Sequence, residues 1–132
     1  MKRFALRGIV VRGDGLGRRL GFPTANLKVS PPAVPPFGVY RVSARAPGLG
    51  TFAAVCSVGR RPTLGESKTP CVEVHIPGFS GNLYGKSLEV VFLEKLRDQR
   101  KFASLEALKA QIRRDVLRVL AKERKTGVEE PR

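Results

Sequence analysis

A glycine-rich segment near the start of the chain carries the residues best suited to chemistry. It runs from Gly13 to Asn26 and reads GDGLGRRLGFPTAN. Glycines let a backbone turn tightly and approach a phosphate closely, and Arg18 can donate charge-assisted hydrogen bonds to phosphate oxygens. Thr24 and Asn26 are expected on one side of an extended segment, because alternate residues share a face. Their side-chain oxygens could both bind a hard cation such as Mg²⁺, which takes oxygen ligands.

This segment differs from the two common phosphate-binding loops. No GK[ST] opens a helix, so it is not a Walker A loop, and it is not the strand–GxGxxG–helix unit of a dinucleotide site. Residue chemistry alone therefore leaves a simpler alternative open, in which a glycine-rich hairpin is followed by an ordinary proline turn.

Strands are the expected elements around this segment, because 14 glycines and 10 prolines divide the chain into short pieces. Apolar and polar residues alternate in several of them; Tyr40, Val42 and Ala44, for example, share one face. Only the end has helical spacing, with Ser104 as the expected N-cap. The pattern predicts a mostly β protein, a small antiparallel barrel closed by a C-terminal helix. The expected strands span 4–11, 38–46, 51–58, 71–76 and 88–93.

Composition restricts the possible partners and location. In 132 residues, 25 Lys and Arg stand against 11 Asp and Glu, a net charge of +14. Such a charge attracts nucleotides, phosphorylated ligands or nucleic acid without choosing among them. No apolar run approaches the roughly 20 residues of a membrane span, and no signal peptide is evident. We therefore expect a cytoplasmic monomer without a membrane, with Cys56 and Cys71 reduced in or near the core.

A series of motifs resembles the riboflavin kinase family. The family pattern is roughly G-x-V-x-x-G-x-x-x-G-R-x-L-G-F-P-T-A-N, and residues 8–26 are similar to it in every named position. The series is ordered as in the family and covers nearly the whole chain, which makes it far more specific than one glycine loop. Its further members are PxGVY at 36–40, SVGRRPT at 57–63, VEVH at 72–75, LYGK at 83–86, FLEKLRD at 92–98 and KFxSLEALKAQIxxD at 101–115.

The resemblance implies a six-stranded antiparallel β-barrel with a C-terminal α-helix. Residues 1–125 would form the riboflavin kinase domain and 126–132 a flexible tail. The implied activity is transfer of the γ-phosphate of ATP to the 5′-hydroxyl of riboflavin, which gives FMN and ADP and requires Mg²⁺. The implied partners are therefore riboflavin or FMN and ATP or ADP.

The resemblance also implies roles for individual residues. Thr24 and Asn26 would bind the Mg²⁺ and the nucleotide phosphates, and Glu73 would be the catalytic base. The implied nucleotide-binding set is Gly13, Gly17, Arg18, Thr24, Asn26 and Tyr84. The implied flavin-binding set lies in the segment 96–102 and at the start of the helix: Arg97, Gln99, Phe102 and Leu105.

The role of Glu73 agrees with the chemistry of phosphoryl transfer. An attacking hydroxyl needs a base within hydrogen-bond reach, while Mg²⁺ and arginine neutralise the phosphates. Strand alternation places Glu73 opposite Val72 and Val74, although a surface strand acid would show the same pattern. We interpret His75, on the same face, as structural.

Residues 59–70 resemble a flap over the nucleotide, and a plain surface loop is the alternative.

The chain departs from the family pattern in three places. Gln99 stands where the family usually has an acid, which puts flavin affinity in question, and Gly78 stands where an aspartate usually precedes Phe79. Bacterial relatives commonly join this module to an adenylyltransferase that converts FMN to FAD. The motifs of that half are absent from this sequence, so we expect the activity to stop at FMN.

Two other classes of function compete with the kinase. The charge suits a basic β-barrel that acts as a flavin-responsive, nucleic-acid-binding regulator without kinase activity. Single-strand binders usually interleave exposed aromatic and basic residues. This chain has seven Phe, two Tyr and no Trp, which are few aromatic residues for stacking on bases. An inactive flavin-binding protein would not need Thr24, Asn26 and Glu73 together, so the kinase is the preferred hypothesis.

Overall fold

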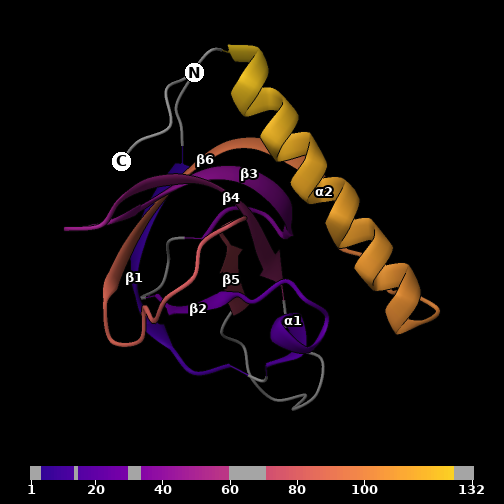
Figure 1. The fold of residues 1–132 in the computed structure, drawn as a ribbon, viewed down its shortest axis with the longest axis horizontal. Coiled ribbons are helices and arrows are strands. Elements are labelled where there is room, and N and C mark those ends of the chain that lie inside the picture. The colour runs from indigo at the N-terminus through magenta and orange to yellow at the C-terminus, as the bar shows by residue number, and fades with distance from the viewer. Residues whose placement is uncertain (1–3, 14, 30–33, 60–70, 127–132) are drawn as a thin grey trace.

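The computed structural model describes residues 4–13, 15–29, 34–59 and 71–126, and six strands within them close a barrel (Figure 1). The strand order around the barrel is β1-β2-β5-β4-β3-β6, and every neighbouring pair is antiparallel. This confirms the predicted fold class. The strands are β1 (Phe4–Val11), β2 (Ala25–Lys28), β3 (Gly38–Ala46), β4 (Gly50–Gly59), β5 (Cys71–His75) and β6 (Ser87–Arg97).

The barrel interior is filled by the apolar face of each strand. Tyr40, Val42 and Ala44 point into it as the alternation predicts, and all three are buried. The Tyr40 ring packs edge-to-face on Phe92 with ring centroids 5.1 Å apart, and its hydroxyl donates to the carbonyl of Pro36 at 2.6 Å. The buried phenol therefore keeps a hydrogen bond, as buried polar groups generally must.

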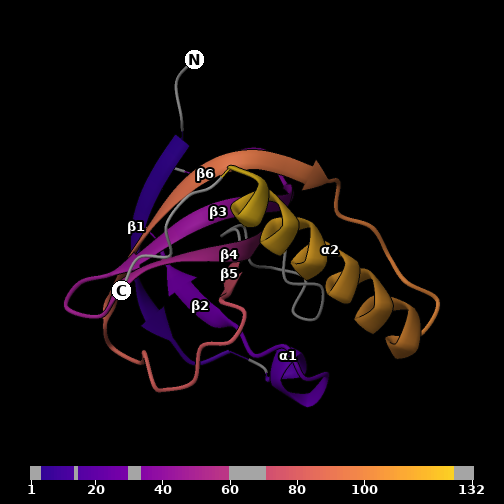
Figure 2. The same ribbon diagram turned by 45° about the horizontal axis from the view of Figure 1, so that its top comes forward.

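The helix α2 (Leu105–Thr126) covers the outer face of β3, β4 and β6 (Figure 2). Ser104 caps its start as predicted, since its Oγ accepts from the Ala107 amide at 3.1 Å. Val119 is fully buried against Val55 and Leu96. The apolar residues at helical spacing thus pack α2 onto β3, β4 and β6 and not, within the described residues, onto β5.

A second helix corrects the expectation that only the end of the chain is helical. The helix α1 (Leu16–Arg19) forms a single turn within the glycine-rich segment. Gly15, with φ of 78°, begins the turn in the left-handed region, and the Phe22 amide closes it by donating to the carbonyl of Gly17 at 2.7 Å. These are local backbone bonds without apolar periodicity, so the sequence pattern did not reveal them.

The cysteines agree with the prediction that they are reduced, and the last strand is longer than predicted. Neither cysteine forms a disulfide bond; Cys56 is buried and Cys71 is partly buried, and burial raises the pKa of the Cys56 thiol. The strand β6 begins one residue before the predicted 88–93 and ends four residues after it. The proposed flap, apart from Gly59, and the tail from 127 onward lie outside the described residues. Neither of the described helices combines the length and apolar character needed to cross a membrane.

Candidate active site

Three side chains form a row on the outer face of the barrel. Glu73 on β5 pairs directly with Asn26 on β2 and with Ser57 on β4. Its neighbours Val72 and Val74 are buried in the barrel interior, so Glu73 points outward, as predicted. Residues paired across antiparallel strands have Cβ atoms about 4.5–5.5 Å apart. Asn26 and Ser57 therefore flank the carboxylate from opposite sides.

Both carboxylate oxygens of Glu73 accept hydrogen bonds. Thr24 Oγ1 donates to Oε1 at 3.1 Å, and Cys71 Sγ lies 3.3 Å from Oε2 as a thiol donor. Two donors on opposite oxygens hold the carboxylate in one orientation, and Glu73 remains partly exposed. A carboxylate of this kind can accept a proton from a hydroxyl placed beside it.

The glycine-rich segment packs tightly against Thr24 and Asn26. A Cβ on Gly13 would collide with the carboxamide of Asn26, and a Cβ on Gly17 would collide with the carbonyl of Phe22 and approach the Thr24 methyl group to 3.3 Å. Larger residues would displace both polar side chains. The two predicted loop glycines therefore bring the backbone close to the row of polar residues.

His75 anchors the turn that precedes Thr24. Its Nδ1 lies 2.7 Å from the carbonyl of Pro23, and since a carbonyl only accepts, Nδ1 carries the hydrogen. The Phe22 ring packs edge-on against the imidazole, with centroids 5.5 Å apart. Burial under this ring lowers the pKa of His75, while the hydrogen bond to Pro23 opposes that change. The structural interpretation of His75 thus agrees with its contacts.

A pocket of about 370 Å³ opens beside Thr24. Arg18 and Tyr84 line it together with Thr24, so the structure brings three of the predicted nucleotide-binding residues to one cavity. Tyr84 is half-exposed, and the Arg12 guanidinium lies 5.5 Å from its ring centroid. An aromatic face beside arginines suits a planar, anionic ligand such as a nucleotide. The remaining lining residues are Val10, Pro23, Ala25, Val74, Ile76, Phe79, Gly81, Asn82 and Leu83.

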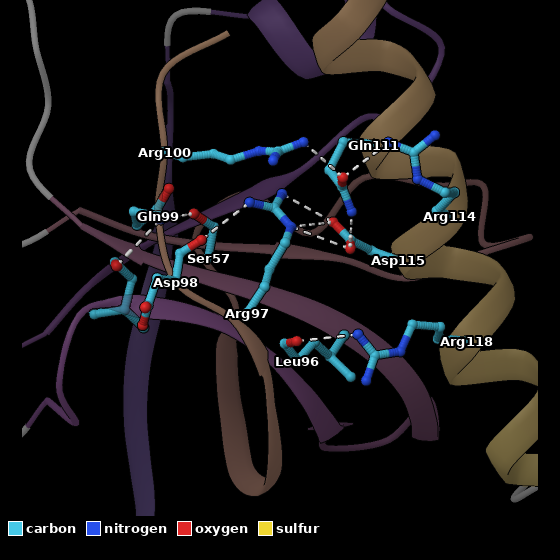
Figure 3. Close-up of polar contacts among 11 residues, drawn as sticks. Ser57, Leu96, Arg97, Asp98, Gln99, Arg100, Gln111, Arg114, Asp115 and Arg118 are labelled. Atoms are coloured by element: carbon cyan, nitrogen blue, oxygen red, sulfur yellow. Dashed lines mark hydrogen bonds and ion pairs between the residues drawn. The ribbon is translucent and has the colours of Figure 1, made fainter.

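The predicted flavin-binding residues do not form one cluster; Figure 3 shows two of them, Arg97 and Gln99, with different partners. Gln99 Nε2 donates to Ser57 Oγ at 2.6 Å and to the Val58 carbonyl at 3.2 Å, which places Gln99 beside the row that contains Glu73. Phe102 instead lies under the guanidinium of Arg97, 5.6 Å away. Leu105, at the start of α2, is exposed and available to an apolar ring.

The partly buried Arg97 forms an ion pair with the fully buried Asp115. Its Nη2 lies 2.9 Å from Oδ2 of Asp115, and its Nε reaches both carboxylate oxygens at 3.1 and 3.2 Å. Asp115 is only 1% exposed and also accepts from Gln111 Nε2 at 3.0 Å. The planar guanidinium thus fastens the end of β6 to α2.

Thr24 and Asn26 suit a divalent cation held jointly with phosphates. Their side chains supply neutral oxygens, hard ligands that Mg²⁺ accepts, and the Glu73 carboxylate beside them adds negative charge. No cluster of three His, Cys, Asp or Glu occurs within the part of the chain that the structure describes. Mg²⁺ usually keeps few protein ligands and completes its shell with substrate phosphates and water, so these residues fit such an ion.

Two residues of the site were missed by sequence reasoning. Ser57 and Cys71 both contact the predicted residues, Ser57 through Gln99 and Cys71 through Glu73. The sequence held one signal for Ser57, since it begins the SVGRRPT motif. For Cys71 the signal was the alternation predicted for 71–76, which places it two residues from Glu73 on the same face.

Comparison with known proteins identifies the family. Residues 1–122 match the family model described as "Flavokinase: Riboflavin kinase". This chain therefore belongs to the riboflavin kinase family, and the match supports the kinase hypothesis over the nucleic-acid-binding alternative. Members of this family use ATP as phosphate donor and generally need a divalent metal.

Individual relatives agree with this assignment. The bifunctional riboflavin kinase/FMN adenylyltransferase of Escherichia coli (strain K12) is 43% identical over 114 residues, which cover 86% of this chain and 36% of that protein. The chain thus spans about a third of the length of that relative. The structure of a riboflavin kinase from Trypanosoma brucei is similar with a TM-score of 0.67 at 27% identity, covering 95% of this chain and 82% of that one.

A third similar structure carries a different name. The crystal structure of a macrolide-efflux protein from Streptococcus pneumoniae has a TM-score of 0.78 and 34% identity to this chain, covering 87% of this chain and 38% of that one. The similarity again covers a minority of the longer protein, which matches the proportion found for the bacterial relative.

Proposed function

We propose that this chain transfers the γ-phosphate of ATP to the 5′-hydroxyl of riboflavin, with FMN and ADP as products. The observation that carries the proposal is the contact between Thr24 and Glu73. It joins a pocket suited to a nucleotide to a carboxylate suited to deprotonate a hydroxyl. A kinase needs these two functions to meet at the transferred phosphoryl group.

Different residues would bind the nucleotide, hold the metal ion and accept the proton. Arg18 and Tyr84 would hold the nucleotide in the pocket, and Thr24 with Asn26 would hold Mg²⁺ beside its phosphates. When bound, this ion neutralises phosphate charge. Glu73 accepts the proton of the attacking hydroxyl as the new oxygen–phosphorus bond forms. The bond between the γ-phosphorus and the bridging oxygen breaks, and ADP leaves with its electron pair.

The chain's own packing supports this division. The glycines beside Thr24 and Asn26 permit a close approach of backbone to phosphate, and the net charge of +14 favours an anionic substrate. The flavin would lie on the Ser57 side of Glu73, near Gln99 and the exposed Leu105. We further propose that the protein acts as a cytoplasmic monomer.

The direct test is an incubation of the purified chain with riboflavin, ATP and Mg²⁺, followed by chromatographic separation of the flavins. The proposal predicts FMN that depends on ATP and is lost when the metal is chelated. If no FMN forms with ATP, GTP or CTP in the presence of Mg²⁺ or Mn²⁺, the proposed activity is wrong.

A further inference from the structure

The side chain of Gln99 is exposed, but its amide lies along β4 and is hydrogen-bonded to that strand. Its Nε2 donates to Ser57 Oγ at 2.6 Å and to the carbonyl oxygen of Val58 at 3.2 Å (Figure 3). It also packs over Gly59, where a Cβ would lie 3.1 Å from Nε2. Three neighbouring residues of one strand therefore hold this amide.

These contacts fix which way the amide faces. The carbonyl of Val58 can only accept a hydrogen bond, so the nitrogen of Gln99, and not its oxygen, must lie on that side. The amide nitrogen has two hydrogens, and the second one is donated to Ser57 Oγ. A glutamate at position 99 has no such hydrogen when ionised and would be repelled by the Val58 carbonyl.

This arrangement determines whether the Ser57 hydroxyl acts as a donor or as an acceptor toward a ligand. A hydroxyl has one hydrogen and two acceptor positions, and Gln99 uses an acceptor position. Among the residues that the structure describes, no acceptor is hydrogen-bonded to the remaining Ser57 hydrogen. Ser57 is partly exposed on the outer face of the barrel, so a ligand on this face can reach its hydroxyl.

Ser57 also lies next to the proposed catalytic base. It pairs with Glu73 across β4 and β5, on the side opposite Asn26. The nucleotide pocket is lined by Thr24 and Ala25, which directly precede Asn26 in the chain, so the pocket and the proposed metal ligands adjoin the β2 side of Glu73. A substrate that presents a hydroxyl to Glu73 and approaches from the other side must therefore pass Ser57.

We infer that Ser57 donates a hydrogen bond to an oxygen of the acceptor's polyol chain, and that Gln99 is the positioning residue that keeps Ser57 in the donor role. The inference rests on the proposed kinase function and adds the group that orients the acceptor alcohol. Gln99 then acts on flavin affinity through Ser57, in place of a direct contact made by an acid.

The first test compares Ser57→Ala with Ser57→Thr, which keeps the hydroxyl. Loss of one neutral hydrogen bond weakens binding by about 2- to 10-fold. We expect Ser57→Ala to raise the riboflavin KM and Kd by about fivefold, with the KM for ATP and kcat little changed, and Ser57→Thr to resemble the wild type. Ser43→Ala, a partly buried strand serine of β3, is the matched control.

The second test asks whether Gln99 acts through Ser57. We expect Gln99→Glu alone to weaken riboflavin binding about as much as Ser57→Ala, and the double variant Ser57→Ala/Gln99→Glu to be no weaker than Ser57→Ala. If the two effects multiply, Gln99 contacts the flavin independently and the inference is wrong. Unchanged riboflavin affinity in Ser57→Ala would also overturn it.

Riboflavin binding is followed by quenching of flavin fluorescence, independently of turnover. This separates the two claims. A wild-type chain that binds riboflavin but makes no FMN contradicts the proposed kinase, whereas a chain that makes FMN equally well with alanine at position 57 contradicts only the role of Ser57. Thermal denaturation of each variant verifies that the fold is retained.

Discussion

Asn26 and Glu73 stand directly opposite each other on β2 and β5, so a carboxamide and a carboxylate share the outer face of the barrel. The pairing depends on strand register, because a shift of one residue would turn one of them into the core. Thr24 strengthens the arrangement by donating to Glu73 from the same strand end. The proposed metal ligands and the proposed base are therefore parts of one rigid unit.

Removal of the Thr24 hydroxyl tests the metal side of this unit. Thr24→Val keeps the shape of the side chain, and we expect it to weaken nucleotide binding in the presence of Mg²⁺ by about tenfold, the equivalent of one charge-assisted contact of roughly 1.5 kcal/mol. Affinity without metal should change little. Calorimetric titration with ADP, with and without Mg²⁺, measures both values.

Thr51→Val is the matched control for this variant, since Thr51 is a partly buried threonine at the start of β4, well separated in sequence from the site. Equal losses of affinity with and without metal in Thr24→Val would show that Thr24 contacts the nucleotide or the fold, and not the ion.

The packing of Gly13 on Asn26 predicts a loss of function without a change in any polar group. In Gly13→Ala the added Cβ would collide with the Asn26 carboxamide, so we expect metal-dependent nucleotide affinity to fall as far as it does in Asn26→Ala. Gly15→Asn is the control, because nothing lies within 4 Å of a Cβ there, and asparagine adopts a φ of 78° with less backbone strain than most residues. Normal affinity in Gly13→Ala would contradict the predicted contact.

The ion pair of Arg97 with the buried Asp115 predicts a large effect on stability. Asp115→Ala leaves an arginine near the interface of β6 and α2 without its partner, and the removal of one member of a buried pair costs about 3–5 kcal/mol. Urea denaturation measures the change. The double variant Arg97→Met/Asp115→Leu should recover much of the loss, because no uncompensated charge remains. A double variant no more stable than Asp115→Ala would contradict this account.

His75 predicts a dependence of stability on pH. Its pKa is lowered in the folded protein, chiefly by burial, so the unfolded chain binds the proton first as the pH falls. The contribution of His75 is therefore fully present above its unfolded pKa of about 6.5 and declines as the pH falls below that value toward the folded pKa. Urea denaturation between pH 7.5 and 5.5 should give a steeper loss for the wild type than for His75→Gln. Parallel profiles would show that His75 contributes nothing to this slope.

The alternation of residues sufficed to predict five of the six strands and the direction of Glu73, whereas β2 was not among the strands that it predicted. Val72, Glu73 and Val74 illustrate why: a period of two places the acid on the face opposite two core residues, whatever the neighbouring strands are. Ser104 likewise signalled the start of α2 through a local cap. These features depend on residues close together in the chain.

Features that depend on distant residues could not be predicted in this way. The turn of α1 is closed by backbone bonds among glycine-rich residues, and Ser57 joins the site only because β4 pairs with β5 in one register. The orientation of the Gln99 amide along β4 depends on the Val58 carbonyl and on the absence of a side chain at Gly59. Such relationships arise from tertiary packing, so the pattern of residues along the sequence does not reveal them.

The central claim is that Glu73 accepts the proton of riboflavin's hydroxyl, and Glu73→Gln tests it most directly. Glutamine keeps an oxygen that can accept from Thr24 but is not a base, so we expect FMN formation to fall by at least about 100-fold. Nucleotide affinity should stay near that of the wild type. Glu106→Gln, an exposed acid on α2, should leave turnover unchanged. Wild-type rates of FMN formation in Glu73→Gln would contradict the account.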